Sequence, residues 1–394
     1  MLKSKVIQRN MPIIGASVRN IVIFITVLSI PLASAENMAL SGAETSSWIL
    51  ALYGLPPLLS LILTIIYRQP LLLTGNLFLI IFINGLGGRV GFPALIGAAM
   101  LAGAGVTVIG LLGITEWLTH WIPVPIMYGL LAGAVLPFLS DIFTTLGEDP
   151  WVVGGTLLVY LFSRRGLRDV VPPVLPALLI GLGITWITGG FQPVEKSLSL
   201  VQPLITKPVF SLPVILTATP VFVVLITLQA NLPAVRFLQS QDYHPPERVI
   251  DIVSGVGMMV GSILGPVGVS LSLPATSLAA GPEAGDHELR HRSIYIVSAA
   301  ALLVALFASA ATVLAGALPM ALLFTLAGLS VVDVLLHAIK RLTEGPLLLG
   351  PLFAFAIALS EISFLGFGNY FWSLVIGTGV SLLLEKEGFE SLRQ

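Results

Sequence analysis

The sequence Leu264-Gly-Pro-Val-Gly-Val-Ser-Leu-Ser-Leu-Pro-Ala-Thr-Ser-Leu-Ala-Ala-Gly281 decides how this chain can fold. The stretch is apolar enough to lie in lipid, but a membrane-spanning helix needs about 20 apolar residues. Gly265, Pro266 and Gly268 interrupt it, so only residues 270–280 are expected to form a short helix. Interrupted backbone at membrane depth is tolerated only where it is buried in protein or lines a cavity. The stretch therefore predicts a buried break inside a membrane protein.

A second stretch of the same kind lies in the N-terminal half: Arg68-Gln-Pro-Leu-Leu-Leu-Thr-Gly-Asn-Leu-Phe-Leu-Ile-Ile-Phe-Ile-Asn-Gly85. Broken segments at corresponding positions in the two halves of a transporter point to its substrate site. We therefore expect a transporter that is built around these two half-helices.

The composition is that of a protein with many membrane spans. Of the 394 residues, 56% are hydrophobic and only 10% are charged, against roughly 25% charged in soluble proteins. The 27 prolines and 39 glycines favour kinked and broken helices. The chain has no cysteine, which excludes disulfides and thiolate metal sites. Its net charge of -1 argues against nucleic-acid binding.

Hydropathy predicts an all-α membrane protein with fourteen full or partial spans. A polar, proline-rich connector at residues 191–211 separates a first unit, residues 1–190, from a second, residues 212–394. A repeat unit with an odd number of spans must insert its second copy upside down, so we expect a seven-plus-seven inverted repeat with half-helices as the third and tenth segments. The predicted segments are 12–34, 47–67, 71–86, 93–115, 121–142, 150–163, 171–189, 212–235, 249–264, 266–281, 293–316, 318–337, 346–363 and 367–384.

The distribution of basic residues agrees with this topology. If the N-terminus is cytoplasmic, most of the 19 Lys and Arg residues lie inside, Arg19 falls within the first span, and only Arg89, Lys196 and Lys207 lie outside. Cytoplasmic loops of membrane proteins carry such an excess of positive charge. The sequence therefore predicts a multi-pass protein of the inner membrane with both termini in the cytoplasm.

The first residues of each half-helix are the candidates for substrate binding. A helix N-terminus presents unpaired N–H groups and the positive end of the helix dipole, which suits an anion such as a carboxylate. The alternative is that these residues are helix N-caps that face other helices. The candidates are Leu73, Thr74, Gly75 and Asn76 in the first half and Val267, Gly268, Val269 and Ser270 in the second.

The eighth segment adds Thr227, Gln229 and Asn231 as candidate substrate ligands. Uncompensated amides are costly in lipid, so both amide side chains should face protein or water. Gln229 and Asn231 do not fully share a helix face, so we expect only one of them to point into a cavity. The alternative for each is a hydrogen bond between helices.

Ionisable residues inside spans are further candidates for function. Asp333 and His337 lie one turn apart on the twelfth segment and form a candidate proton relay. The alternative is that both lie at the membrane boundary. Asp251 opens the ninth segment, where a carboxylate is expected to complement the helix dipole.

Two runs resemble a known family. The run Val223-Val-Leu-Ile-Thr-Leu-Gln-Ala-Asn-Leu-Pro-Ala-Val235 resembles its eighth-helix pattern, in which polar Gln and Asn are followed by Pro. The run Gly265-Pro-Val-Gly-Val-Ser-Leu-Ser-Leu-Pro-Ala-Thr-Ser-Leu-Ala-Ala-Gly-Pro-Glu-Ala284 resembles its broken tenth segment. This is the benzoate:proton symporter (BenE-like) family, which is similar to the nucleobase–ascorbate and sulphate-permease transporters. The resemblance implies a core domain that carries substrate between the half-helices, a gate domain, elevator-type movement and often a dimer.

These observations predict secondary active transport of a small organic anion, an aromatic carboxylate such as benzoate, by proton symport. The alternatives are a carrier of inorganic anions or nucleobases and a membrane protein that binds without transporting. The sequence contains no nucleotide-binding loop, metal-ligand cluster or catalytic triad, so we expect no enzyme activity, metal or cofactor. The expected partners are the anionic substrate, protons, the lipid bilayer and a second copy of the chain in a homodimer.

Overall fold

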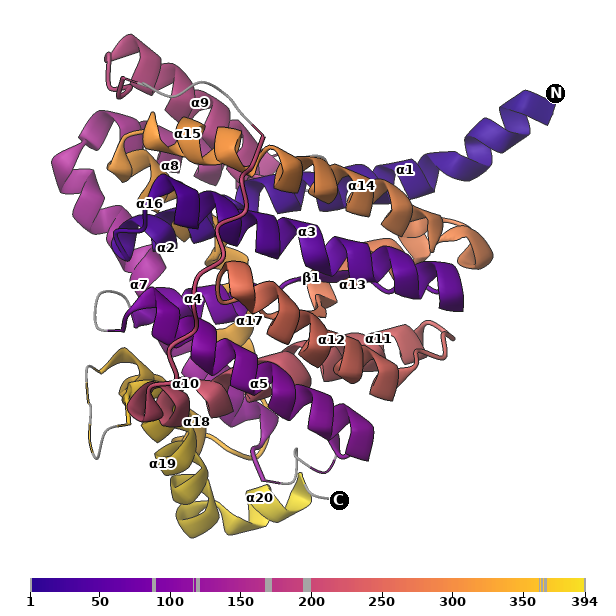
Figure 1. The fold of residues 1–394 in the computed structure, drawn as a ribbon, viewed down its shortest axis with the longest axis vertical. Coiled ribbons are helices and arrows are strands. Elements are labelled where there is room, and N and C mark those ends of the chain that lie inside the picture. Colours follow the sequence, from indigo (N-terminus) through magenta and orange to yellow (C-terminus); the bar gives the residue numbers. More distant parts are fainter. Residues whose placement is uncertain are drawn as a thin grey trace.

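The computed structural model describes residues 2–86, 90–115, 117, 121–166, 172–193, 200–360, 362, 364 and 367–392. The protein is mostly helical, with many of its helices packed side by side (Figure 1). Seven of the described helical stretches are long and apolar enough to cross a membrane, judged by length and composition. The prediction of a helical membrane protein is confirmed. The seven stretches are Met11–Asn37, Gly42–Tyr67, Phe92–Leu112, Val124–Glu148, Leu212–Ser240, His287–Leu306 and Met320–Thr343.

The first half contains eight described helices and one short strand. Helix α3 begins with a capping box, in which Ser41 Oγ accepts from the Glu44 N–H and the Glu44 carboxylate accepts from the Ser41 N–H. This reciprocal arrangement satisfies N–H groups that a helix start leaves unpaired. The elements are α1 (Leu2–Val27), α2 (Ser29–Asn37), α3 (Gly42–Tyr67), β1 (Leu73–Gly75), α4 (Leu77–Gly85), α5 (Phe92–Leu112), α7 (Val124–Glu148), α8 (Pro150–Gly166) and α9 (Val174–Ile187).

The second half has a similar make-up, with a π-helix and three 3₁₀ turns in addition. Its elements are α10 (Leu212–Val224), the π-helix η1 (Leu225–Asn231), α11 (Leu232–Ser240), α12 (Glu247–Gly261), η2 (Ser262–Leu264), β2 (Val269–Leu271), α13 (Leu273–Ala280), η3 (Pro282–Ala284), η4 (His287–Leu289), α14 (Arg292–Leu306), α15 (Ala308–Gly316), α16 (Met320–Ser330), α17 (Val332–Thr343), α18 (Leu349–Leu359), α19 (Asn369–Leu384) and α20 (Lys386–Ser391).

The strands β1 and β2 correct the expectation of a purely helical fold. They pair antiparallel, with Leu73 opposite Leu271, Thr74 opposite Ser270 and Gly75 opposite Val269. Each strand immediately precedes a short helix, α4 or α13, which therefore begins later than the sequence indicated. The pairing satisfies backbone groups that a simple break in a membrane-spanning helix would leave without partners.

The chain leaves helical geometry at Gly265, as the sequence predicted. Its φ of +150° and ψ of 152° lie in a region that is essentially restricted to glycine. The fully buried Trp48 of α3 packs against it, and Trp48 Nε1 donates to the carbonyl of Pro266 at 2.8 Å. A Cβ on Gly265 would lie 2.6 Å from Trp48 Cδ1. Trp48 and Gly265 together fix the path by which the chain enters β2.

Helices α5 and α12 pack with their backbones in direct contact. A Cβ on Gly103 of α5 would lie 2.6 Å from the carbonyl oxygen of Gly255 on α12, and one on Gly110 would lie 2.9 Å from the Cβ of Asp251. Small residues at such positions allow helices to approach closely in membranes. The closely packed α5–α12 pair lies beside β2, which packs on α12.

The described part of the connector, residues 200–211, crosses helices of both halves in an extended path (Figure 1). Its N–H groups at Val201 and Thr206 donate to the carbonyls of Leu306 and Ile263 in the second half. Its N–H groups at Leu204 and Val209 donate to Ser47 Oγ and to the carbonyl of Pro93 in the first half. Residues 200–211 are therefore attached to helices of both halves.

Helix α18 receives an N-terminal cap from the far end of α19. The Glu385 carboxylate accepts hydrogen bonds from the N–H groups of Leu348, Leu349 and Gly350 at 2.6, 2.7 and 3.0 Å. The Ser381 hydroxyl donates to the same carboxylate. Burial raises the pKa of Glu385, but these four donors favour the charged form more strongly, so its pKa lies below the usual value.

Candidate functional site

The pairing of β1 with β2 brings the two interrupted stretches of the sequence together. The N–H of Asn76, just after β1, donates to the carbonyl of Gly268, just before β2, at 2.7 Å. Helices α4 and α13 continue from the two strands. The residues that precede each short helix therefore share one small region, as a common binding site requires.

Asn76 caps α4 and joins the two halves. Its Oδ1 accepts from the N–H of Leu79 at 2.8 Å, and its Nδ2 donates to Ser270 Oγ at 2.9 Å. Both side chains are buried. The N-cap interpretation is thus confirmed for Asn76, and the cap also faces the opposite strand.

Helix α13 begins without a side-chain cap. Ser272 occupies the N-cap position in extended conformation, and Pro274 lies in the first turn, where its missing N–H costs nothing. The Ser-x-Pro pattern was the signal that could have located this start. The expectation that N-terminal helix amides come from residues 267–270 and 73–76 is wrong, because strands and turns occupy those positions and the helices begin at Leu273 and Leu77.

A cavity of about 540 Å³ lies beside the strand pair. Its volume is in the range of small-molecule binding sites. Of the predicted site residues, it is lined by Thr74, Gly75, Asn76, Gln229, Ser270, Asp333 and His337. The first turn of α13, from Ser272 to Ala275, also lines it, as do Leu77 and Phe78 of α4.

The lining is mostly apolar and aromatic, and the described residues that form it include no Lys or Arg. Phe24, Tyr53, Phe78, Tyr128 and Tyr160 all contribute. Tyr53 is held in place because its hydroxyl donates to the carbonyl of Phe24 at 2.9 Å. Sequence reasoning missed these aromatic residues, since nothing in a hydrophobic span distinguishes a cavity-facing ring from a lipid-facing one.

Gln229 supplies an unpaired amide to this cavity. It belongs to the π-helix η1, a rare conformation that is frequent at functional sites. Its side chain is only 6% exposed, and its Oε1 has no hydrogen-bond partner among the described residues. Buried polar groups normally have partners, so this oxygen points to a ligand or a bound water.

Asn231 lies elsewhere. It lines a second cavity, and its amide bonds to Asp251, to Ser254 and to the N–H of Leu271. Only one of the two amides on the eighth segment therefore lines the large cavity, as expected. Thr227 is fully buried and donates to the carbonyl of Val223 in its own helix.

Four predicted residues support the site from behind instead of lining it. Leu73, Val267 and Val269 are fully buried. A Cβ on Gly268 would lie 2.8 Å from the Cβ of Asn76. The glycine therefore allows the two interrupted stretches to pack closely, and the space beside it is filled by Asn76 and not by a ligand.

Asp333 and His337 both line the cavity, but no hydrogen bond joins them among the described contacts. Asp333 is 63% exposed and forms an ion pair with Arg164 of α8, which also donates to the Tyr160 hydroxyl. The His337 ring packs edge-on against Tyr128, with 5.4 Å between ring centroids.

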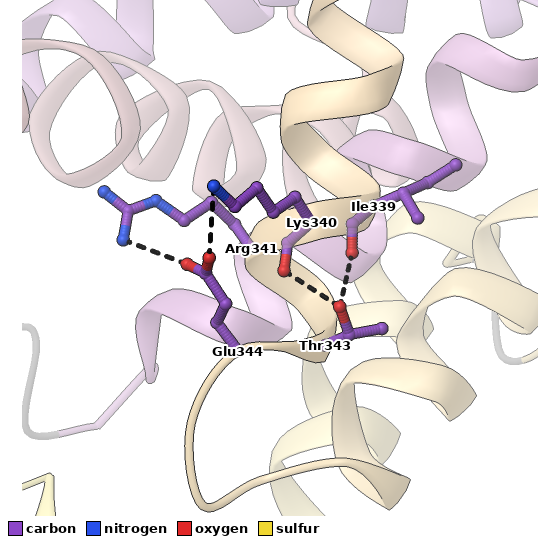
Figure 2. Close-up of polar contacts among 5 residues, drawn as sticks. All are labelled: Ile339, Lys340, Arg341, Thr343 and Glu344. Carbon is purple, nitrogen blue, oxygen red and sulfur yellow. Dashed lines mark hydrogen bonds and ion pairs between the residues drawn. The ribbon is translucent and has the colours of Figure 1, made fainter.

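The charged end of α17 follows one turn beyond His337. Figure 2 shows Glu344 between Lys340 and Arg341, at 3.7 and 3.5 Å, and the Thr343 hydroxyl on the carbonyls of Ile339 and Lys340. Cations in the last turn of a helix complement its dipole. Asp333 and His337 are the polar side chains that α17 contributes to the cavity lining.

The model of the benzoate membrane transport protein (BenE) family matches residues 9–383. The chain belongs to this family. The resemblance seen in the sequence is thereby confirmed, and the chain is a membrane transporter.

Two curated relatives match this BenE-family chain over most of their lengths. It is 28% identical to the inner membrane protein YdcO of Escherichia coli (strain K12) over 344 residues, which cover 85% of the chain and 86% of the relative. It is 26% identical to the benzoate membrane transport protein of Acinetobacter baylyi (strain ATCC 33305 / BD413 / ADP1) over 363 residues, covering 90% of each.

Solved structures share the fold of this BenE-family chain. The transmembrane domain of the cyanobacterial bicarbonate transporter BicA aligns with a TM-score of 0.55 at 16% identity, covering 98% of the chain and 97% of that domain. The murine Slc26a9 anion transporter, in an inward-facing state, aligns with a TM-score of 0.66 at 14% identity, covering 95% and 68%. At these identities the likeness concerns the fold alone.

Proposed function

We propose that the chain transports a small aromatic carboxylate such as benzoate, by proton symport. The observation that carries this proposal is the 540 Å³ cavity, whose aromatic and apolar lining suits a ring and whose few polar groups gather at the strand pair. Membership of the BenE family and the named activity of the Acinetobacter baylyi relative support the same substrate class.

The carboxylate would lie at the start of α13, near Ser270 and Gln229. The N–H groups of the first turn of α13 have no side-chain cap and carry the positive end of the helix dipole. The Gln229 amide and the Thr74 hydroxyl line the same cavity. Because the described residues that line the cavity include no Lys or Arg, binding depends on dipoles, which favours a singly charged anion that leaves readily.

The proposed mechanism uses fourteen segments as a seven-plus-seven inverted repeat, with units at 1–190 and 212–394 joined by the connector. A core domain would carry the two half-helices past a gate domain in an elevator-type movement, in a homodimer of the inner membrane with cytoplasmic termini. Each predicted segment overlaps at least one described helix, which supports this division. Asp333 and His337, which line the cavity, are candidates for the proton path.

The test is uptake of radiolabelled benzoate into proteoliposomes under an imposed pH gradient. We expect gradient-dependent accumulation that other aromatic carboxylates compete for, and that bicarbonate, sulphate and uracil do not. Competition by bicarbonate or uracil instead would identify an inorganic-anion or nucleobase carrier. Since the chain has no cysteine, single cysteines introduced near each terminus and labelled from one side test the orientation.

A further inference from the structure

Asp251 lines a second cavity that shares no lining residue with the substrate cavity. The second cavity measures about 200 Å³, and only 4% of the Asp251 surface is exposed. The carboxylate accepts two hydrogen bonds, from Asn231 Nδ2 to Oδ1 at 2.8 Å and from the Thr115 hydroxyl to Oδ2 at 2.5 Å. The sequence indicated only a partner for the helix dipole here.

Within the described part of the chain, this carboxylate forms no ion pair. Among the described residues, no Lys, Arg or His nitrogen lies within the 4.0 Å ion-pair distance of Asp251. Helix α12 packs mainly against α3, α5, β2, η1 and η2. Of these elements, all but α3 lack titratable side chains. The titratable residues of α3, which are Glu44, Tyr53 and Tyr67, do not line the second cavity. The charged groups that line it with Asp251 are Glu247 and Arg248 of its own helix, with the Arg248 guanidinium against Gly113.

Asn231 connects Asp251 to the substrate cavity. Its Nδ2 donates to Asp251 and to Ser254 Oγ, and its Oδ1 accepts from the N–H of Leu271 at 2.9 Å. Leu271 ends β2 and lines the substrate cavity. A charged Asp251 can only accept hydrogen bonds, so it fixes the orientation of the Asn231 amide and, through it, the position of β2.

Asp333 differs from Asp251 in its surroundings. Its side chain is 63% exposed, and its carboxylate forms an ion pair with the Arg164 guanidinium. Asp251 is buried, accepts hydrogen bonds from the neutral donors Asn231 and Thr115, and lines a cavity separate from the proposed substrate cavity.

We propose that Asp251 binds the co-transported proton and that Asn231 transmits its charge state to β2; this inference rests on the proposed proton symport. The proton adds to one carboxylate oxygen to give the neutral acid, and on release it passes to water in the second cavity. Hydrogen bonds to ionised groups are roughly twice as strong as those between neutral groups. Protonation therefore weakens the bond from Asn231 to Asp251 and loosens the hold of Asn231 on Leu271.

The experiment compares wild type with Asp251→Asn in proteoliposomes. One assay measures accumulation of external radiolabelled benzoate driven by a pH gradient. The other measures exchange of external radiolabelled benzoate for unlabelled internal benzoate without a gradient. In Asp251→Asn we expect accumulation to fall to the level seen without a gradient, while exchange continues. The matched control is Asp141→Asn on α7, which removes a carboxylate that lines neither cavity and should leave both assays unchanged.

Gradient-driven accumulation that persists in Asp251→Asn would overturn the inference. So would a parallel loss of exchange and accumulation, which a purely structural role predicts. If Asp251→Asn does not fold, the variant Thr115→Val tests the inference instead. It removes one hydrogen-bond donor from the Asp251 carboxylate, so the midpoint of the pH profile of uptake should rise by about one pH unit. An unchanged midpoint overturns the inference. A wild type without gradient-driven uptake would instead refute the proposed function itself.

Discussion

Replacing Gly265 with alanine tests the packing that directs the chain into β2. The new Cβ would lie 2.6 Å from Trp48 Cδ1 and 2.9 Å from Trp48 Cβ and Cγ. The indole cannot move away easily, because it is fully buried and its Nε1 is bonded to Pro266. The substitution therefore combines a steric clash with an unfavourable backbone conformation.

The two costs can be estimated separately. A non-glycine residue in this region of φ and ψ costs roughly 1–3 kcal/mol, and overpacking a well-packed core costs about 1–3 kcal/mol. We therefore expect Gly265→Ala to lower the free energy of unfolding by roughly 2–6 kcal/mol. Transport should also fall, because β2 carries the residues that face Asn76.

The measurement is unfolding of purified protein in mixed micelles with increasing dodecyl sulphate, together with benzoate uptake. Gly183→Ala in α9 is the matched control, because a Cβ there would meet nothing within 4 Å, and alanine in a helix is expected to stabilise by about 0.5–1 kcal/mol. If Gly265→Ala unfolds within about 0.5 kcal/mol of wild type, the size of a typical surface substitution, the proposed role of the Trp48–Gly265 contact is wrong.

Three further predictions concern the cavity and the α18 cap. Gln229→Leu should abolish benzoate uptake with unfolding free energy unchanged or raised, since it removes a buried oxygen that has no partner; a parallel loss of both would indicate a structural role. Asn76→Asp should retain the cap on Leu79 but raise the KM for benzoate, because it adds a negative charge beside the anion; an unchanged KM places the carboxylate elsewhere. Glu385 has a lowered pKa in the folded protein, so its contribution to stability is complete above the unfolded pKa of 4.5 and is lost as the pH falls through the folded pKa. The difference in unfolding free energy between wild type and Glu385→Gln should therefore shrink below about pH 4.5, and a constant difference would contradict the cap.

The sequence predicted the helical fold and the two breaks because their causes are local. Apolar runs identify membrane helices, and a Gly-Pro pair such as Gly265-Pro266 interrupts a regular helix regardless of its surroundings. The β1–β2 pairing was not predictable from either stretch alone, because each strand is only three residues long and is defined by its partner nearly 200 positions away. The later starts of α4 and α13 follow directly from that pairing.

For the site, the sequence identified the polar residues but not their orientations. Gln229 and Asn231 are two residues apart and do not fully share a helix face, so only one was expected to face the substrate cavity; Gln229 does so, and Asn231 bonds to Asp251. Hydropathy indicated neither which of the two it would be nor the π-helix that contains both. Gly268 was expected to admit a ligand, but it admits Asn76 instead, because a glycine permits close approach by any neighbour.

The attachment points of residues 200–211 all lie on α3, α5, α14 and the Ser262–Leu264 turn, or next to them. Helix α3 packs on β1 and α14 packs on α3, while α5 packs on α12, which itself packs on β2. We therefore place these elements in the moving core domain of the proposed elevator, and residues 200–211 would move with that domain. Residues 200–211 would then add no flexibility between the two domains, and the shorter links at 188–192 and 317–319 would have to change conformation in each transport cycle. A proline introduced into one of those links, with residues 200–211 unchanged, should therefore stop transport while benzoate binding is retained.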